Sequence, residues 1–471
     1  MSSHVTNIVI IGGGPAGYEP AYVADSLGAT VTLVDMDAPG GACVHYDCVP
    51  SKAFIASSEV VSNTRQAERL GVRMPSPNEI TVDAPKVNQR VKDLARAQVA
   101  DVSAGLARTK VKVVRGRARL IETVDHSTHA VEIIPADGPA YTEVADVVLV
   151  ATGASPRVVA GAEPDGERIL DWRQVYDLPE LPSNLIVIGS GVTGAEFASA
   201  YNEMGSHVTL IASRDRVLPH EDSDAARLLE DTMTRRGMTI LTHGRADSVT
   251  NTGDGVRVAL ADGRVIEGSH CLMTVGSVPN TRDIGLEDIG VKLDDGGFIK
   301  VDRVSRTSVP GVYAAGDCTG VLMLASVAGM QGRIAMWHSL GEAVAPLQLK
   351  TVSSNIFTHP EIATVGIGEK TVDDRDMDVR MVTLPLRTNA RAKMAGLEDG
   401  FIKLYCRPTT GVVIGGVVVA PHASELIMPV TLAVQHRLTV QHLAQTFTVY
   451  PSITGSISEA ARRLMEHDDL D

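Results

Sequence analysis

Short apolar runs alternate with segments of mixed polarity along much of the chain. Residues 7–11 (NIVII) and 29–35 (ATVTLVD) are rich in β-branched residues, and a glycine-rich turn followed by a helix-like segment separates them. The same succession returns at 184–188 (NLIVI) and 206–213 (SHVTLIAS). Continuous apolar strands separated by helices are typical of a parallel sheet covered on both faces. The pattern therefore predicts two α/β domains that repeat one another.

The C-terminal part of the chain has a different pattern. From about residue 351, alternating strands such as 401–406 (FIKLYC) and 412–420 (VVIGGVVVA) are followed by helical segments. This change predicts a separate α+β domain. Proline-containing stretches at 177–184 and 342–350 are typical of boundaries between domains.

A glycine-rich turn follows the first strand. Gly12, Gly14 and Gly17 stand in the spacing GxGxxG, and the second strand ends in Asp35, eighteen residues after Gly17. The first glycine permits the turn, the second lets the backbone approach a pyrophosphate, and the third lets the helix pack on the strand. The pyrophosphate would lie at the helix N-terminus, and Asp35 would hydrogen-bond a ribose. Strand, turn, helix and acid together predict a Rossmann-like dinucleotide site.

The same spacing follows the strand at 184–188, where Gly189, Gly191 and Gly194 form a second copy of the turn. A single GxGxxG match is weak, but two complete copies in the same context favour two dinucleotide sites.

The two copies differ at one informative position. Eighteen residues after Gly194 stands Ala212, where the first copy has its acid, and Ser213, Arg214 and Arg216 follow. The carboxylate that would hold a free ribose 2′-hydroxyl is missing, and a guanidinium suits a 2′-phosphate. NADPH is therefore favoured or at least accepted at the second site. The alternative is that the two arginines are solvated surface charges.

Composition and charge exclude several classes of protein. The chain has 471 residues and a formal net charge of −14, which argues against nucleic acid or an anionic membrane as partner. Its length allows about three domains. Five cysteines do not make a disulfide-stapled scaffold, and the N-terminus has neither a signal-type region nor an apolar run long enough to cross a membrane. We expect a cytoplasmic enzyme without a transmembrane segment or a metal site.

Cys43 and Cys48 bracket four residues in the segment 40–52 (GGACVHYDCVPSK). Five residues of a regular α-helix rise about 7.5 Å, which exceeds the Cα separation of ~7 Å that a disulfide spans. A bridge therefore requires an irregular backbone, which Gly40-Gly41 would favour. A helix that begins near Pro50 would place its positive end beside Cys48 and lower the pKa of that thiol.

We also assign roles to His45 and to the three cysteines that lie outside this segment. His45 either supplies a proton near the sulfurs or packs the loop, and we prefer the packing role. Cys271, Cys318 and Cys406 lie in apolar strands or turns and are predicted to be core residues.

With these motifs, the chain resembles the flavoprotein disulfide reductases, the family of dihydrolipoyl dehydrogenase and glutathione reductase, over essentially all 471 residues. The GGGPAG turn with Asp35 is similar to the family's FAD fingerprint. The ATGASP segment with Thr152 and Gly153 is similar to its second flavin motif, and AAGDCTG with Gly316 and Asp317 to the motif that holds the flavin ribityl chain. The segments SNIFTHPEIATVG and APHASELI resemble the domain through which the family dimerises.

The resemblance implies an FAD-dependent homodimer that oxidises NADPH or NADH. It assigns the predicted domains as the first part of an FAD-binding domain (1–155), an NAD(P)-binding domain (156–280), a second FAD-binding or central part (281–350) and an interface domain (351–471). It also implies that Gly41 contacts FAD and that Gly276, in the segment TVGSVPNT, contacts NAD(P).

Catalytic roles also follow from the resemblance. Lys52 and Glu196 match a lysine and a glutamate that pair near the flavin N5 and the nicotinamide. Cys48 matches the charge-transfer thiolate that faces the flavin, and Cys43 matches the cysteine that meets the substrate.

One departure from the family bears on function. A disulfide substrate needs an acid/base, and the family supplies a histidine and, five residues later, a glutamate from the partner subunit. In the corresponding stretch TVYPSITGSISEAA, Tyr450 stands in place of the histidine and Gly455 in place of the glutamate. Tyrosine has a pKa near ~10, so it is a weak substitute for an imidazole. His45 is the other candidate proton donor.

The chain closely resembles bacterial lipoamide-dehydrogenase-like quinone reductases, which share the GGA…DCVPSK helix, the TVGSVPNT segment and the VYPS…GSI…EAARRLM tail. In those relatives the first cysteine position is generally not cysteine, so Cys43 is a departure. We predict an NAD(P)H:quinone oxidoreductase, in which flavin or a Cys48 thiolate–flavin pair reduces a quinone held by Tyr450 of the partner subunit. Alternatives are a disulfide reductase or a transhydrogenase with a relocated proton donor, and a redox-sensing flavoprotein.

Overall fold

The computed structural model describes residues 5–73 and 80–465 of the chain. These residues form two compact units, each assembled from three separate stretches. Of the described residues, those within Met1–Ala53, Gln89–Arg157 and Gly276–Gln348 form unit 1, and those within Phe54–Asn88, Val158–Val275 and Leu349–Asp471 form unit 2. Within the described helices, no stretch combines the length and the apolar character that a membrane crossing requires.

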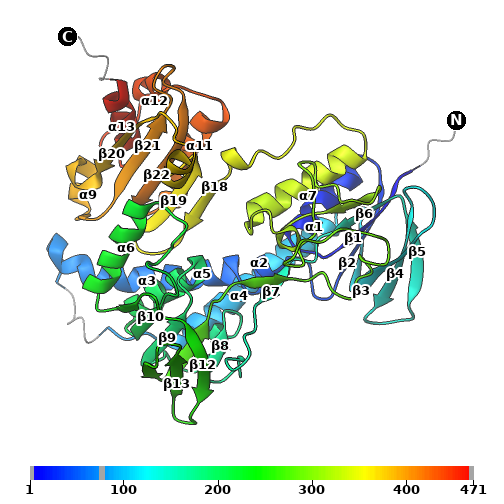
Figure 1. Ribbon diagram of the computed structural model, residues 1–471, viewed down its shortest axis with the longest axis horizontal. Coiled ribbons are helices and arrows are strands. Elements are labelled where there is room, and N and C mark those ends of the chain that lie inside the picture. Colours follow the sequence, from blue (N-terminus) through cyan, green and yellow to red (C-terminus); the bar gives the residue numbers. More distant parts are fainter. Residues whose placement is uncertain (1–4, 74–79, 466–471) are drawn as a thin grey trace. The chain divides into compact units, whose positions relative to one another are not determined.

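Unit 1 is organised around a seven-stranded sheet with the order β17-β6-β1-β2-β3-β4-β5 (Figure 1). Strands β17, β6, β1, β2 and β3 are parallel, and β4 and β5 extend the sheet as antiparallel strands. The bounds are β1 Asn7–Ile11, β2 Thr30–Asp35, β3 Lys112–Thr123, β4 His129–Pro135, β5 Tyr141–Ala145, β6 Val147–Val150 and β17 Val312–Ala314. A small antiparallel pair joins β7 (Ala154–Pro156) to β16 (Ser277–Pro279).

Both faces of the parallel part of this sheet are buried. Ile8 and Ile10 belong to one apolar cluster, and their neighbours Val9 and Ile11 belong to another on the opposite face. Helices α1 (Pro15–Ser26) and α7 (Ala325–Ser339) lie side by side on the first face, together with the end of α4 (Ala84–Leu106) (Figure 1). Burial of both faces explains why the strands read as continuous apolar runs.

Unit 2 contains a second parallel sheet, with the order β11-β10-β9-β15-β8, and a three-stranded antiparallel sheet β12-β13-β14. The bounds are β8 Ile169–Asp171, β9 Asn184–Ile188, β10 His207–Ile211, β11 Thr239–Leu241, β12 Ala246–Asn251, β13 Val256–Leu260, β14 Val265–Gly268 and β15 His270–Met273. Helices α5 (Val192–Met204) and α6 (Ser223–Arg235) follow β9 and β10. The predicted repeat of the strand, turn and helix arrangement is therefore present.

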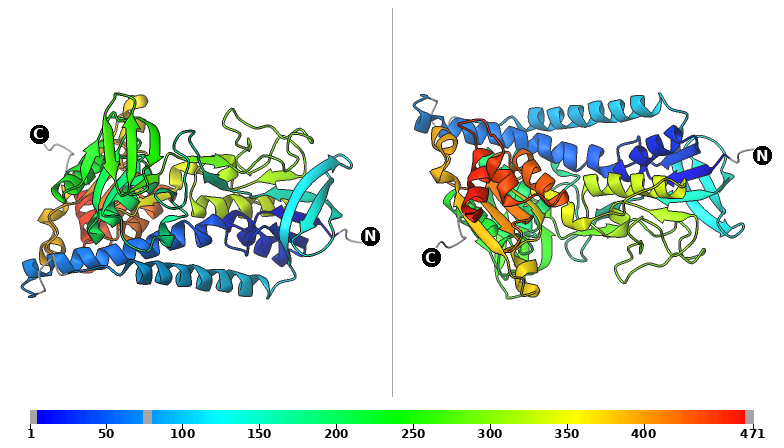
Figure 2. Two further views of the ribbon diagram at one scale, coloured as in Figure 1. Left: turned by 90° about the horizontal axis from the view of Figure 1, so that it is seen from below. Right: turned by 90° about the horizontal axis from the view of Figure 1, so that it is seen from above.

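The C-terminal part of unit 2 is a five-stranded antiparallel sheet, β18-β19-β22-β21-β20, with the helices between residues 428 and 465 packed on one face (Figure 2). The strands are β18 Ser353–Ile356, β19 Glu361–Gly366, β20 Arg380–Pro385, β21 Phe401–Cys406 and β22 Val413–Ala420. The helices are α8 Glu369–Asp374, α9 Ala390–Met394, α10 Ala423–Leu426, α11 Met428–Gln435, α12 Val440–Gln445 and α13 Gly455–Met465. Apolar residues of α11, α12 and α13 share one core cluster with the sheet. The predicted α/β fold with a C-terminal α+β domain is confirmed.

A buried ion cluster links this antiparallel sheet to the parallel part of unit 2. Lys403 on β21 is 1% exposed, and its Nζ donates to Asp222 Oδ2 at 2.8 Å and to Asp224 Oδ2 at 2.7 Å. Asp222 also caps α6 by accepting the backbone N–H groups of Asp224 and Ala225. Loss of one partner in such a cluster leaves the other charge buried without compensation.

We expect Lys403→Met to lower the free energy of unfolding of unit 2 by about 3–5 kcal/mol, because Asp222 would stay buried without its counter-charge. The midpoint of urea unfolding, followed by circular dichroism, measures the change. The control is Arg257→Met, whose guanidinium pairs with Glu267 on the surface, and we expect it to cost about 1 kcal/mol or less. Equal losses in the two variants would contradict a stabilising role for the buried cluster.

Candidate functional site

The two glycine-rich turns have the same backbone conformation. Gly12 has φ 111° and Gly189 has φ 112°, a region that favours glycine. The caps of the helices that follow are also alike, with φ −70° and ψ −174° at Gly14 and φ −74° and ψ −173° at Gly191. The two turns are therefore structural copies, as their spacing predicts.

The third glycine of each turn allows the helix to pack directly on the turn. A Cβ added to Gly17 would lie 1.9 Å from the carbonyl oxygen of Gly12, and a Cβ added to Gly194 would lie 1.9 Å from that of Gly189. No side chain larger than hydrogen fits at either position without moving backbone.

The N-termini of α1 and α5 are free of side-chain caps. Neither Gly14 nor Gly191 supplies a side-chain hydrogen bond to the first turn of its helix. The first N–H groups of a helix have no partner within the helix, and the helix dipole adds positive potential at this end. Both helix starts are therefore suited to a pyrophosphate.

The acid at the end of β2 lies beside the first turn. The backbone N–H of Gly13 donates to Oδ2 of Asp35, and that of Asp37 donates to Oδ1 at 2.8 Å. Burial raises the pKa of Asp35, although these two backbone hydrogen bonds lower it. The carboxylate is thus fixed in position at the place where a ribose would lie.

A second segment approaches this turn without side chains in between. The N–H of Gly40 donates to the carbonyl oxygen of Gly13 at 2.8 Å, and a Cβ on Gly41 would lie 2.6 Å from the Cα of Gly14. Gly41 therefore lies against the first glycine turn, and its contact with FAD stays a prediction.

Two residues that the sequence analysis did not single out form hydrogen bonds that hold the segments after β6 and β17 in place. Asn280 donates from Nδ2 to the Thr152 carbonyl oxygen at 3.0 Å, and its N–H donates to that of Gly153 at 3.0 Å. The buried Gln331 on α7 accepts the Gly316 N–H at 2.9 Å. Sequence reasoning missed both because each acts from another element, although Asn280 belongs to the TVGSVPNT segment.

Asp317 begins a short 3₁₀ helix (Asp317–Thr319) directly after Gly316. Burial raises the pKa of Asp317 to about 6, and the nearby charge of Asp47 contributes. A carboxylate here would accept a hydrogen bond from a ligand hydroxyl, which relieves part of the cost of burial. A bare glycine turn, a fixed ribose acceptor and this buried acid together fit FAD.

The segment that follows β10 contains the residues that the sequence predicts for the second nucleotide site. Ala212 is fully buried, and Ser213 and Arg214 are exposed. Arg216 is half-buried and donates from Nη2 to the Pro219 carbonyl oxygen at 3.5 Å. These residues fit a nucleotide that carries a 2′-phosphate. Gly276 belongs to unit 1, so its contact with a nucleotide held by unit 2 stays a prediction.

The two cysteines lie on either side of a helix break. Cys43 is on α2 (Gly41–His45), and Cys48 is the first residue of α3 (Cys48–Gln66), with Tyr46 and Asp47 between the helices. The irregular backbone that a bridge requires is therefore present. The thiols are not bridged, and a hydrogen bond joins them.

The two thiols shift each other's pKa in opposite directions. The hydrogen bond from Cys48 lowers the pKa of Cys43, although burial opposes this, and Lys52 acts in the same direction as the hydrogen bond. The hydrogen bond, burial and the Asp47 charge all raise the pKa of Cys48. The lower pKa that a helix start would give Cys48 stays a prediction, and burial and the Asp47 charge oppose it.

The structure agrees with the packing role of His45 and with the core positions predicted for the three remaining cysteines. Nε2 of His45 donates to the Ala38 carbonyl oxygen at 2.8 Å, which is the packing role. Cys271, Cys318 and Cys406 are fully buried, so the core prediction for them is confirmed.

The lysine and the glutamate lie in different units. Lys52 is on α3 in unit 1, where its charge lowers the pKa of Cys43 and of Asp47. Glu196 is on α5 in unit 2, 3% exposed, and its Oε1 accepts the N–H of Phe357 at 2.9 Å. The pairing of Lys52 with Glu196 stays a prediction.

The segment that replaces the histidine–glutamate dyad is exposed and apolar. Tyr450 is 86% exposed, Phe447 102% and Val449 80%. Gly455 is the first residue of α13. The segment therefore presents three large side chains on the surface of this chain, with no acid or imidazole at positions 450 and 455.

Comparison with known proteins agrees with this arrangement. Residues 6–332 match the family model described as pyridine nucleotide-disulphide oxidoreductase, and residues 352–461 match its dimerisation domain. The chain is 56% identical to an NAD(P)H dehydrogenase (quinone) of Mycobacterium tuberculosis, over 99% of this chain and 95% of that protein. It is 34% identical to a dihydrolipoyl dehydrogenase of Chlamydia muridarum, over 96% of this chain and 95% of that protein. The crystal structure of LpdA from M. tuberculosis superposes with a TM-score of 0.93 at 56% identity, covering 98% of this chain and 100% of that one.

A pair of variants separates the two roles of glycine in the second turn. Gly194→Ala should lower the melting temperature, because its Cβ would collide with the Gly189 carbonyl oxygen. Gly191→Ala meets no atom within 4 Å, so it should melt like the wild type but raise the KM for NADPH by blocking backbone approach to the pyrophosphate. Differential scanning fluorimetry and steady-state kinetics measure the two effects. Wild-type KM in a correctly folded Gly191→Ala would contradict a nucleotide site here.

Proposed function

Because the chain belongs to the pyridine nucleotide-disulphide oxidoreductase family, we propose that it is an FAD-dependent NAD(P)H:quinone oxidoreductase. The observation that carries the choice of acceptor is Tyr450, which stands where a disulfide reductase needs a histidine. The 56% identity to an enzyme named for quinone reduction supports the same choice.

The chain's own residues would hold both nucleotides. The first turn, Asp35 and Asp317 would bind FAD, and the second turn with Arg214 and Arg216 would bind NAD(P)H. When bound, FAD accepts a hydride from the nicotinamide and passes electrons to the acceptor. In our proposal Lys52 and Glu196 orient the reacting rings. Glu196 is held in place by the Phe357 N–H.

A quinone suits a site without an acid/base dyad. Reduction of a disulfide releases a thiolate that must be protonated, and a general acid/base of suitable pKa contributes about 10²–10⁴-fold to such steps. A quinone takes up electrons first and can be protonated by water, so loss of the dyad costs it less. In the proposed dimer, Tyr450 of one subunit hydrogen-bonds or stacks on the acceptor at the partner's site.

The exposed segment supports the dimer. Single apolar residues on a surface need no explanation, but a run of three large exposed side chains in a dimerisation domain is typical of an interface. We propose a cytoplasmic homodimer divided into the domains 1–155, 156–280, 281–350 and 351–471.

A disulfide reductase with a relocated proton donor is the second candidate. The hydrogen-bonded pair of Cys43 and Cys48 favours it, since a reductase of that type needs both thiols. In this alternative the half-buried Asp47 or His45 would have to supply the proton.

Turnover with two acceptors tests the proposal. We expect NADPH-dependent reduction of a naphthoquinone to exceed reduction of lipoamide by at least about a hundredfold, the lower range of acid/base catalysis. Both rates are measured on the same FAD-loaded preparation. Efficient lipoamide reduction with weak quinone reduction would sink the proposal.

The variant Cys43→Ser distinguishes a quinone reductase from a disulfide reductase in the same experiment. The variant should keep its quinone turnover, whereas a disulfide reductase would lose activity with every disulfide substrate. In an anaerobic NADPH titration, uptake of one equivalent by both proteins supports flavin-only transfer. A second equivalent that is lost in Cys43→Ser assigns a redox role to the pair.

The role of the arginines after β10 can be tested by comparing NADPH with NADH as the electron donor. Arg214→Ala should raise the KM for NADPH by about tenfold and leave the KM for NADH unchanged, because a charged hydrogen bond to the 2′-phosphate would be lost. Arg264→Ala is the control, since this exposed arginine pairs with Asp262. If Arg214→Ala changes neither KM, its guanidinium is a solvated surface charge.

A further inference from the structure

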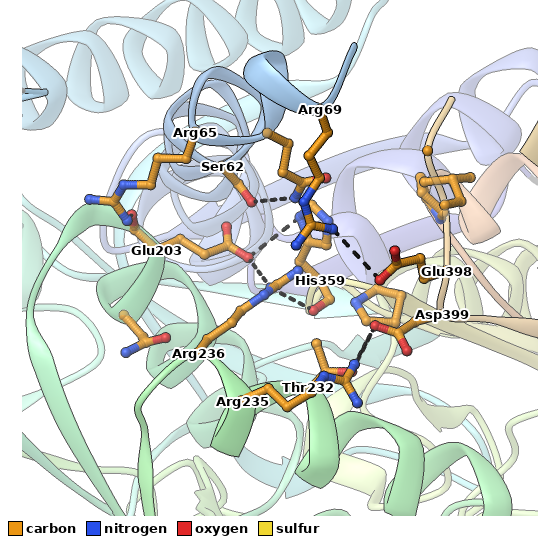
Figure 3. A pocket seen from close by; sticks show the side chains of 16 residues that line it. Ser62, Arg65, Arg69, Glu203, Thr232, Arg235, Arg236, His359, Glu398 and Asp399 are labelled. Carbon is orange, nitrogen blue, oxygen red and sulfur yellow. Dashed lines mark hydrogen bonds and ion pairs between the residues drawn. The ribbon is translucent and has the colours of Figure 1, made fainter. Parts of the chain in front are cut away.

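Unit 2 contains a cavity of about 690 Å³ that is separate from the glycine turns. Four arginines line it, which is notable in a chain with a net charge of −14. Arg65 is near the end of α3, Arg69 lies in the 3₁₀ helix Ala67–Leu70, and Arg235 and Arg236 stand at the end of α6. Figure 3 shows Arg236 directed at Glu203 and Arg69 directed at Glu398 in the cavity.

The innermost charges of the cavity surround Glu203. Its side chain is 4% exposed, its Oε1 accepts from Arg236 Nη1 at 2.8 Å, and His359 Nδ1 lies 3.4 Å from the same oxygen. Burial raises the pKa of Glu203 to about 7, although Arg236 opposes this. Burial and Arg236 lower the pKa of His359 to about 4, so its ring is neutral at neutral pH.

The outer pairs of the cavity are weak. Arg69 Nη1 lies 3.6 Å from Glu398 Oε2, and both side chains are more than half exposed, at 65% and 79%. Arg235 contacts Asp399, with side chains 56% and 37% exposed. Exposed ion pairs contribute about 1 kcal/mol or less, so these guanidinium groups can exchange partners at little cost.

Arg65 adds a further donor. Its Nη1 donates to the Glu203 carbonyl oxygen at 2.6 Å, and no ion pair joins it to a carboxylate among residues 5–73 and 80–465. Three carboxylates line the cavity against four guanidinium groups, and one of the three, Glu203, is partly protonated near pH 7. The cavity therefore has an excess of positive charge.

From this charge excess and geometry, we propose that the cavity binds a small organic oxyanion, a molecule that carries phosphate or carboxylate groups. Guanidinium groups present planar pairs of donors that match both groups. Ser62, Asn202 and Thr232 add neutral hydrogen-bonding groups to the lining. The volume lies within the range of small-molecule sites, about 300–1,000 Å³.

Titration calorimetry on the FAD-loaded enzyme with saturating NADP⁺ tests this site, because both nucleotide sites are then filled. Pyrophosphate and citrate serve as the phosphate and carboxylate probes. We expect at least one of them to bind, and Arg69→Ala/Arg235→Ala to weaken that binding by about tenfold or more through loss of two charged hydrogen bonds. Arg257→Ala, which removes another exposed and paired arginine of unit 2, should bind like the wild type.

Each remaining outcome overturns the proposal. Absence of binding by both probes means that the arginines only hold the segments of unit 2 together. Equal weakening in Arg257→Ala means that the effect is one of total charge. Unchanged binding in a double variant with wild-type melting temperature and FAD content means that the anion binds elsewhere.

Discussion

Close approach of backbone to backbone at the two glycine turns is the constraint on which the rest of the structure depends. Gly17 against Gly12 and Gly194 against Gly189 leave no space for a side chain. This contact aims each helix N-terminus at the end of its parallel sheet, where the polar N–H groups remain available. Dinucleotide binding, and with it the redox chemistry, follows from this placement.

In our proposal, the residues around the acceptor are separate from the nucleotide sites, so the same fold can serve different acceptors. The turns, Asp35 and Asp317 keep the features of the family, whereas positions 450 and 455 in the C-terminal domain have changed. In our proposal, this change in acid/base groups alters which acceptor is reduced without disturbing how the nucleotides are held. The hydrogen-bonded cysteines are the part of the site that still resembles a disulfide reductase.

Within unit 2, charged side chains also connect segments that are far apart in the sequence. Lys403 connects β21 to the start of α6, and the segment that begins with Phe357 contacts Glu196 and then, at His359, the arginine-lined cavity. Each contact joins residues more than a hundred positions apart. Buried charges of this kind are stable only when every partner is in place, so they define how these segments pack.

The sequence by itself determined the strands, the two turns, the core cysteines and the loss of the histidine. These features are local, because β-branched runs, glycine spacing and the identity of one residue act within a few positions. Tertiary structure alone placed Cys48 in a partly buried position beside Asp47, and both the burial and the Asp47 charge raise the pKa of that thiol. Only the tertiary structure showed that Asn280 and Gln331 hold the segments after β6 and β17 through hydrogen bonds. It also brought together, in one cavity, four arginines that lie between positions 65 and 236 of the sequence. Such contacts depend on long-range packing, for which a single sequence carries no periodic signal.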